Sequence, residues 1–231
     1  MTWPRDVPPG PRSAEEEAYR ILRSRIDLSR LPKHSRDVTE RVIYATADFD
    51  YATDLVCDEE ALAAAVAALA GGAAVVADAA TVAAGITGCP VVCKVGEPLT
   101  ARLARTASIS TAAAAVRLAF GEVGPGAVWV VGCAPAALTE ILSRGVEPAF
   151  VIGLPVGFVG AAEAKDALRA SGICSVSNVS EKGGAAVAAA ALEALLGSAL
   201  QLSGSRAGWG PGTGATGAAG GLAPAPGGPA T

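Results

Sequence analysis

The chain has 231 residues, a length that suits one α/β domain with tails and that allows a substantial core. Hydrophobic residues make up 51% of the chain and aromatic residues only 4%, so alanine and valine carry the apolar content, as in parallel strands covered by helices. The formal net charge is -4 and the chain contains no lysine- and arginine-rich block, which argues against a nucleic-acid partner.

The two ends of the chain differ in composition from its centre. Residues 1–13 are rich in proline, and from residue 203 onward the chain is mostly Gly, Ala, Pro and Thr. Such segments bury too little apolar surface to order themselves, so we predict a domain over 14–202 between a disordered amino-terminal segment and a disordered tail over 203–231. The first residues lack the layout of a signal peptide, which favours a cytoplasmic protein.

Helices are predicted in the first third of the chain. The first is expected over residues 14–26, and the second from residue 35 or 37 to about 45, which places the only histidine, His34, before its start. Asp58 opens a third helix over residues 59–70, and a glycine pair ends it. The apolar run from 61 to 77 is broken by these glycines, so it fits helix, turn and buried strand, and no membrane partner is expected.

From residue 74 onward, predicted strands alternate with predicted helices. Strands are expected over 74–77, 91–95, 127–131, 149–154 and 174–177, and helices over 111–120, from Pro135, over 161–170 and over 184–196. This alternation indicates βαβ units with helices on both faces of a sheet. We infer an α/β fold, a three-layer α/β/α sandwich with a mostly parallel, flavodoxin-like sheet.

The cysteines do not form a metal-binding pattern. The chain has five of them, none in a CxxC pair: Cys57, Cys89, Cys93, Cys133 and Cys174. The odd number favours buried, reduced thiols. Cys89 and Cys93 are close in sequence, but the only histidine lies far from them, so we predict no metal site.

Glycine-rich turns follow three of the predicted strands. Each offers backbone N–H groups at the start of a helix, where an acidic group of a ligand can bind. The candidate binding residues in these turns are Gly132, Ala134, Pro135, Gly157, Gly160, Lys182, Gly183 and Gly184. The alternative interpretation of each turn is an ordinary connection between strand and helix.

Three charged residues near these turns have their own interpretations. Asp78, at a strand end, either contacts a ligand or accepts hydrogen bonds from a nearby helix N-terminus. Glu163 and Lys165 are expected to be a solvated pair, because residues two apart point to different faces of a helix.

Five segments occur in an order and spacing that resemble the precorrin-8X methylmutase family of cobalamin biosynthesis. They are Arg-Val-Ile-Tyr-Ala at 41–45, and the segments 77–86, 132–138, 153–165 and 182–192. The resemblance implies the flavodoxin-like fold and an isomerase that moves a methyl group from C11 to C12 of precorrin-8X or cobalt-precorrin-8, to give hydrogenobyrinic acid or its cobalt counterpart. It also implies a tetrapyrrole ligand, no redox cofactor, and a homodimer with the site near the subunit interface.

The chain departs from this family at two candidate site residues. The family places a proton-donating histidine where this chain has Tyr44, and a carboxylate-binding arginine where it has Thr111. A phenol, with a pKa of about 10, is about three units less acidic than an imidazolium. Tyr44 is therefore either a weaker proton donor or an aromatic side chain that fills the space of the histidine. A less secure alignment puts Ala18 where relatives have serine and Glu193 where asparagine is common.

Three functions remain open from the sequence. The chain is an active methylmutase with Tyr44 as catalytic donor, a divergent and inactive or repurposed tetrapyrrole-binding relative, or a non-catalytic interaction protein on the same scaffold. Lys182 and the intact glycine turns favour the first two, and the residues at 44 and 111 favour the second over the first. The family resemblance makes corrin isomerisation the best single prediction.

Overall fold

The computed structural model describes residues 11–207, and these contain one six-stranded sheet in the order β1-β6-β5-β4-β2-β3. The strands are β1 (Leu55–Cys57), β2 (Val75–Ala77), β3 (Val91–Val92), β4 (Val128–Val131), β5 (Phe150–Gly153) and β6 (Ser175–Asn178). Strands β2 to β6 are parallel, and β1 pairs antiparallel with β6. With β2 counted as the first strand, the parallel part has the 2-1-3-4-5 order of flavodoxin-like sheets. The predicted fold class is confirmed.

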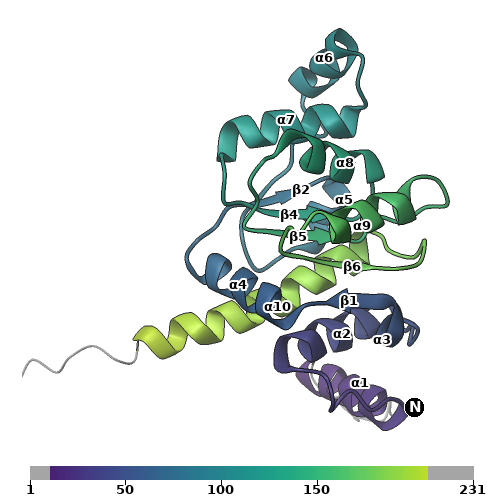
Figure 1. Cartoon of the computed structure of the whole chain (residues 1–231). Helices are drawn as coiled ribbons and strands as arrows, with labels where there is room; N and C mark the ends of the chain where they lie inside the picture. Colours follow the sequence, from purple (N-terminus) through teal and green to yellow (C-terminus); the bar gives the residue numbers. More distant parts are fainter. Residues whose placement is uncertain (1–10, 208–231) are drawn as a thin grey trace, which may run out of the picture.

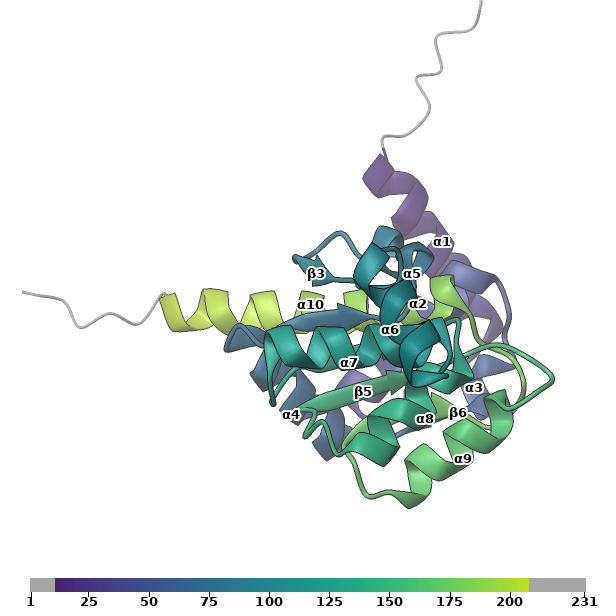
Figure 2. The same cartoon turned by 90° about the horizontal axis from the view of Figure 1, so that it is seen from above.

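Helices cover both faces of the sheet (Figure 1). Those of the described residues are α1 (Pro11–Arg25), α2 (Lys33–Thr46), α3 (Tyr51–Asp54), α4 (Glu59–Ala70), α5 (Ala80–Gly85), α6 (Pro98–Ala107), α7 (Thr111–Val123), α8 (Pro135–Arg144), α9 (Ala161–Ala170) and α10 (Ala185–Ala207). Helices α7, α8 and α9 lie on one face, and α4 and α10 on the other, as the view from above also shows (Figure 2). Helix α2 packs along α10, and α1 lies outside α2.

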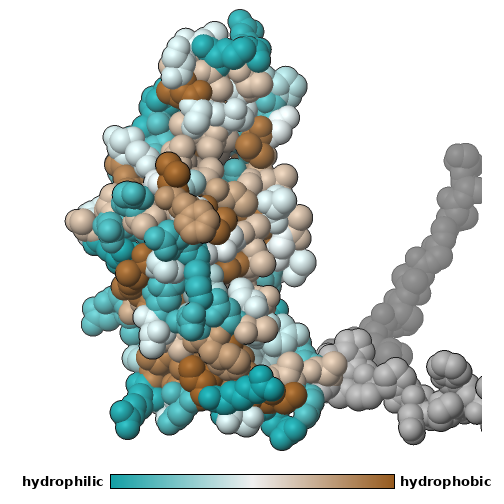
Figure 3. Space-filling model, turned by 90° about the vertical axis from the view of Figure 1, so that its right-hand side faces the viewer, coloured by the Kyte–Doolittle hydropathy of each residue, from teal (hydrophilic) through white to brown (hydrophobic). Residues whose placement is uncertain are grey.

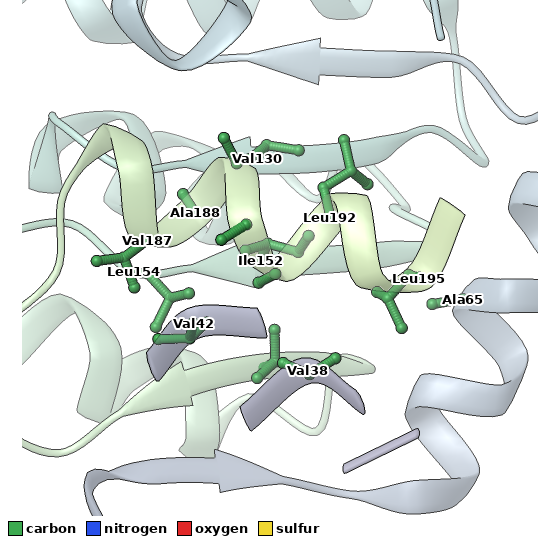
Figure 4. Close-up of a cluster of buried hydrophobic side chains, with 14 of the residues drawn as sticks. Val38, Val42, Ala65, Val130, Ile152, Leu154, Val187, Ala188, Leu192 and Leu195 are labelled. Carbon is green, nitrogen blue, oxygen red and sulfur yellow. The ribbon is translucent and has the colours of Figure 1, made fainter. Parts of the chain in front are cut away.

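Two hydrophobic clusters form on the two faces because strand side chains alternate in direction. In β4, Val128 and Val130 join the cluster under α10, whereas Trp129 and Val131 join the one under α7 and α8. The close-up in Figure 4 shows α10 between the strands and α2, with side chains from all three in contact: Val38, Val42, Val130, Ile152, Val187, Ala188, Leu192 and Leu195. The small alanines of α10 let it approach the sheet closely, so this helix is a central part of the core.

Helix α10 is also long and apolar enough, over Ala185–Ser203, to cross a membrane by length and composition alone. More than half of that stretch is buried inside the protein, at 56%. Packing against α2, α4 and α5 accounts for its apolar composition, as expected of a core helix.

Four elements were not predicted from the sequence: α3, β1, α5 and α6. The first three are only 4, 3 and 6 residues long, too short for a clear periodic pattern. Strand β3 has 2 residues instead of the five predicted, and it is an edge strand. Helices α1 and α10 extend to Pro11 and Ala207, slightly into the segments predicted to be disordered, and the remainder of those segments lies outside the described residues.

The start of α2 corrects the prediction for His34. The helix begins at Lys33, so His34 lies in its first turn rather than before it. The carboxylate of Glu59, from α4, accepts hydrogen bonds from the backbone N–H groups of His34 and Ser35, both at 2.9 Å. Burial opposes ionisation of this carboxyl, but these hydrogen bonds outweigh it and lower the pKa of Glu59. An acceptor distant in sequence therefore starts the helix earlier than the local pattern indicates.

Replacement of Glu59 by alanine is expected to lower the free energy of unfolding by about 1–2 kcal/mol at pH 7, because two N–H groups at the start of α2 lose their acceptor. Since folding lowers the pKa of Glu59, its contribution is present above the unfolded pKa of about 4.3 and is lost as the pH falls through the folded value. Urea unfolding at pH 7 measures the loss of stability in the variant, and unfolding at pH 3 shows whether the contribution of Glu59 disappears. Glu60→Ala, at an exposed neighbouring position, is the control and should change stability by less than about 0.5 kcal/mol.

Candidate active site

The carboxylate of Asp78 occupies the position where flavodoxin-like sheets commonly bind a ligand. Strands β2 and β4 lie at the point where the strand order reverses, and ligands often bind at the carboxyl ends of strands there. Asp78 follows β2 and accepts hydrogen bonds from the backbone N–H groups of Gly132, Cys133 and Ala134, at 3.0, 2.9 and 2.7 Å. Burial raises the pKa of Asp78, although these three hydrogen bonds act in the opposite direction.

This geometry shows the hydrogen bonds to a helix N-terminus that one of the two interpretations of Asp78 predicted. The residue binds the start of α8, so the N–H groups of Gly132 and Ala134 donate to it and are not free for an acid group of a ligand. Position 132 also requires glycine, because a Cβ there would lie too close to the carbonyl oxygen of Gly184, at 2.9 Å. Pro135 is the first residue of α8, as predicted, and lies beside Gly160.

Two loops at the carboxyl edge of the sheet lie against each other. The first follows β5 and contains Gly157 and Gly160; the second follows β6 and contains Gly183 and Gly184. The Gly157 N–H donates to the carbonyl of Glu181 at 3.1 Å, and the Gly184 N–H donates to that of Leu154 at 2.9 Å. We call them the β5 loop (residues 154–160) and the β6 loop (residues 179–184). Both are visible on the right of Figure 1.

The glycines of these loops have conformations that other residues rarely adopt. The φ angles are 150° at Gly157, 78° at Gly160, 150° at Gly183 and 125° at Gly184. A Cβ at Gly183 would overlap the carbonyl oxygen of Leu154. The loops can therefore approach this closely only with glycine at that position.

A buried polar network supports the β6 loop and corrects the prediction for Lys165. This side chain is 0% exposed rather than solvated. Its ammonium group donates to Asn178 Oδ1, at 2.9 Å, and to the carbonyls of Ser180 and Lys182. Asn178 Nδ2 in turn donates to Asp54 Oδ2 at 2.7 Å. Spacing along α9 could not reveal these acceptors, because they lie at the end of the next strand, β6, and in the loop that follows it.

Asp54 anchors the same loop from α3. Its carboxylate also accepts hydrogen bonds from the backbone N–H groups of Val179, at 3.1 Å, and Ser180, at 2.8 Å. Burial opposes ionisation of Asp54, but hydrogen bonds from Asn178 and Ser180 outweigh it and lower its pKa. The sequence analysis missed Asp54 and Asn178; the only available signal was a carboxylate beside a short apolar stretch.

Lys182 is paired within the chain. Its Nζ lies 2.7 Å from Asp48 Oδ2 and 2.6 Å from Asp50 Oδ2, and 5.9 Å from the ring centroid of Tyr51. Hydrogen bonds to the two carboxylates raise the pKa of Lys182, and the same lysine lowers that of Asp48. Lys182 thus joins the β6 loop to the turn after α2. Burial raises the pKa of the neighbouring Tyr51 to about 12.

Tyr44 lies on α2, next to a small apolar pocket. Its ring stacks on that of Tyr19 from α1, with centroids 5.0 Å apart and an interplanar angle of 9°, and the guanidinium carbon of Arg41 lies 5.3 Å from its centroid. The side chain is 39% exposed. The pocket has a volume of about 250 Å³ and is lined by Ala18, Ile21, Leu22, Arg25, Ile43, Tyr44, Ala47 and Phe49. Ala18 and Tyr44 therefore lie at the same pocket.

Thr111 is separated from Tyr44 by the sheet. It is the first residue of α7, on the opposite face from α2, and is exposed. Ala115, one turn further along α7, lines a cavity of about 10 Å³ together with Asp78, which places Thr111 near the carboxyl edge. The glycine turns, Asp78 and Lys182 thus lie together at this edge, whereas Tyr44 and Thr111 flank it on two different faces.

Glu193, on α10, contacts the loop after α5. Its carboxylate accepts hydrogen bonds from the backbone N–H groups of Thr87, at 2.6 Å, and Gly88, at 3.1 Å. Glu193 therefore holds the loop after α5 against α10.

The thiols and acidic groups do not form a metal site in residues 11–207. All five cysteines are free, but four are only partly buried and Cys174 is exposed, so the prediction of buried thiols is wrong for Cys174. Burial raises the pKa of Cys57 to about 12, which keeps that thiol protonated.

Comparisons with known proteins identify the family of this chain. The family model described as Precorrin-8X methylmutase matches residues 13–198. The precorrin-8X methylmutase of a Sinorhizobium species is 36% identical over 192 residues, covering 78% of this chain and 91% of that protein. The cobalt-precorrin-8 methylmutase of Salmonella typhimurium is 35% identical over 199 residues, covering 80% and 94%.

A solved structure gives the same result. The precorrin-8X methylmutase of Thermus thermophilus superposes with a TM-score of 0.76 at 32% identity, covering 83% of this chain and 98% of that one. Since the family model spans most of the described fold, the chain belongs to the precorrin-8X methylmutase family.

Proposed function

We propose that this protein is a corrin-ring isomerase of cobalamin biosynthesis that moves a methyl group from C11 to C12 of precorrin-8X or cobalt-precorrin-8. The family match over residues 13–198 is the observation that carries this proposal. It is supported by relatives named for either substrate. An isomerisation within one molecule requires no external methyl donor and no net oxidant. We propose that the protein acts in the cytoplasm on a tetrapyrrole ligand.

In the proposed mechanism, Tyr44 is the proton donor to a ring nitrogen of the substrate. Its ring is held by the stack on Tyr19 and by Arg41, and it borders a pocket with an apolar lining. A positioned ring of this kind loses little conformational freedom when the ligand binds. A phenol is a weaker acid than an imidazolium, so proton transfer from it has less driving force. We therefore expect slower turnover than a histidine at this position would support.

The β5 and β6 loops are proposed to form the wall of the ligand site. Their glycines let backbone atoms line the carboxyl edge of the sheet, and Lys182 places a positive charge at the same edge. That charge is offset by Asp48 and Asp50, so Lys182 alone gives a weaker hold on a polyacid than an unpaired cation. Thr111 adds no charge. These observations favour the second candidate function, a divergent relative that binds the macrocycle and is inactive or repurposed.

We further propose that the protein acts as a homodimer. Tyr44 and Thr111 lie on different faces of one chain, and a second copy can bring one face of each subunit to a shared ligand. The β5 loop also presents two large apolar side chains to solvent, Phe158 at 95% and Val159 at 89% exposure. Figure 3, which faces the side of the molecule that carries these loops, shows apolar surface across its middle. Such surface is common at interfaces between subunits.

Substitution at position 44 tests the proton donor. Tyr44→His is expected to raise the rate of product formation from precorrin-8X about 10- to 100-fold, because part of a driving force of about 4 kcal/mol is regained. Tyr44→Phe keeps the ring stack and removes the hydroxyl, and it should abolish turnover. Absorbance of the rearranged product measures both rates.

A double variant separates an active methylmutase, the first candidate, from a divergent tetrapyrrole-binding relative, the second. If the wild type binds product without turnover and the Tyr44→His, Thr111→Arg double variant gains turnover, the chain is a divergent binder. Equal rates for the wild type and Tyr44→Phe would contradict the role of the hydroxyl. Lack of binding by every form would point to an interaction protein.

Light scattering coupled to gel filtration tests the homodimer. The wild type is expected to elute with twice its chain mass of 22.7 kDa. Replacing Phe158 and Val159 by serine should shift the equilibrium toward monomer, because apolar surface buried in the dimer is lost. Leu99→Ser, at another exposed apolar position, is the matched control. A wild type that is monomeric at micromolar concentration would refute the dimer.

A further inference from the structure

Lys165 is a buried cation whose charge is met by neutral oxygen atoms. Its ammonium group has three N–H donors and three acceptors: Asn178 Oδ1, the Ser180 carbonyl and the Lys182 carbonyl. Within residues 11–207 it forms no ion pair, and the nearest carboxylate in the hydrogen-bond network is Asp54, which Asn178 contacts. All three acceptors lie within residues 178–182, at the start of the β6 loop.

The position of Lys165 links the two loops at the carboxyl edge. It lies on α9, which starts directly after the β5 loop at Ala161. Its side chain reaches across to the end of β6 and fixes two carbonyl groups in the following loop. The same loop then contacts the β5 loop through Gly184 N–H and the Leu154 carbonyl. The ammonium group of Lys165 thus stabilises the contact between the β5 and β6 loops from the buried side.

We propose that Lys165 is a positioning residue for the ligand site: its ammonium group holds the β6 loop in the shape that places Gly183 and Gly184 against the β5 loop. The identity of the ligand rests on the proposed function, whereas the shape of the loop does not. Lys165 itself is too deeply buried to touch a ligand.

Simple packing does not explain a charge at this position. A methionine fills a similar volume without the cost of desolvating an ammonium group. The same burial lowers the pKa of Lys165 to about 8. Among the charged groups around it, Asp54 from α3, Glu181 from the β6 loop and Asp166 from α9 raise the pKa, and Arg169 from α9 lowers it. Lys182, whose carbonyl Lys165 contacts, directs its own charge to Asp48 and Asp50.

Deprotonation of Lys165 is expected to change loop order and global stability in opposite directions. A neutral amine has two N–H donors for three oxygens and turns a lone pair toward one of them, so the β6 loop loosens above pH 8. Because the folded pKa is lower than the unfolded value, the contribution of Lys165 to global stability instead rises between about pH 8 and pH 10.4. Loop order and ligand affinity fall over a pH range in which this residue makes the fold more stable. A lysine that only filled space would leave loop order and ligand affinity unchanged over this pH range.

Hydrogen exchange of the full-length protein tests the position of the loop without any ligand. In Lys165→Met, the amides of Gly157 and Gly184 should exchange at least about 10-fold faster, while those of β4 and β5 stay protected. Lys165→Gln retains two donors and should lie between. Lys94→Met, which removes a lysine paired with Glu97 and Glu122, is the matched control and should leave both loops unchanged.

Binding of hydrogenobyrinic acid tests the consequence for the site. Its affinity should fall at least about 10-fold in Lys165→Met at pH 7, and that of the wild type should fall as the pH rises through 8, whereas the variant has no such step. Unchanged exchange at Gly184 in Lys165→Met, or unchanged affinity, would overturn the proposal. If that variant does not fold, Lys165→Gln and the pH series of wild-type exchange decide. If the wild type binds no corrinoid, the proposed function fails, and exchange alone decides the role of Lys165.

Discussion

The rest of the site depends on the contact between the Asp78 carboxylate and the start of α8. In flavodoxin-like sheets the N–H groups at this point are available to an anionic ligand, but here a side chain of the protein supplies the anion. The contact joins β2 to α8 and occupies these three N–H groups. The β5 and β6 loops project further along the same edge.

These two loops are joined by contacts that composition alone does not suggest. Glycine lets their backbones approach, and buried polar groups then hold them: Asp54, Asn178 and Lys165 on the inside, with Lys182 and its two aspartates on the outside. Positive and negative groups are nearly balanced in this arrangement. These loops are accordingly shaped mainly by backbone, and the proposed tetrapyrrole ligand would meet their outline rather than one strong charge.

Much of the fold could be predicted from the sequence, and the limits have physical causes. Helices α4 and α9 begin and end where expected, because Asp58 and the glycine pair mark one and the glycine turn opens the other. The predicted start of α2 was wrong because Glu59, which accepts hydrogen bonds from its first turn, is distant in sequence. For the site, the glycine turns were found, since their backbone requirement is local. The burial of Lys165 was not, because it depends on contacts across a strand. Of the two interpretations of Asp78, the structure shows the hydrogen bonds to a helix N-terminus. The roles of Tyr44 and Thr111 remain predictions.

The stack between Tyr19 and Tyr44 has a dynamic consequence. Helix α1 packs mainly against α2 and lies outside the main layers of the fold, so it is held by fewer buried contacts than the core helices. Segments of this kind open locally at a lower free energy than the whole domain. The ring of Tyr44 loses one of its neighbours whenever α1 detaches, and its orientation follows that opening equilibrium. Mild denaturant should therefore free the ring of Tyr44 from its stack before the sheet itself unfolds.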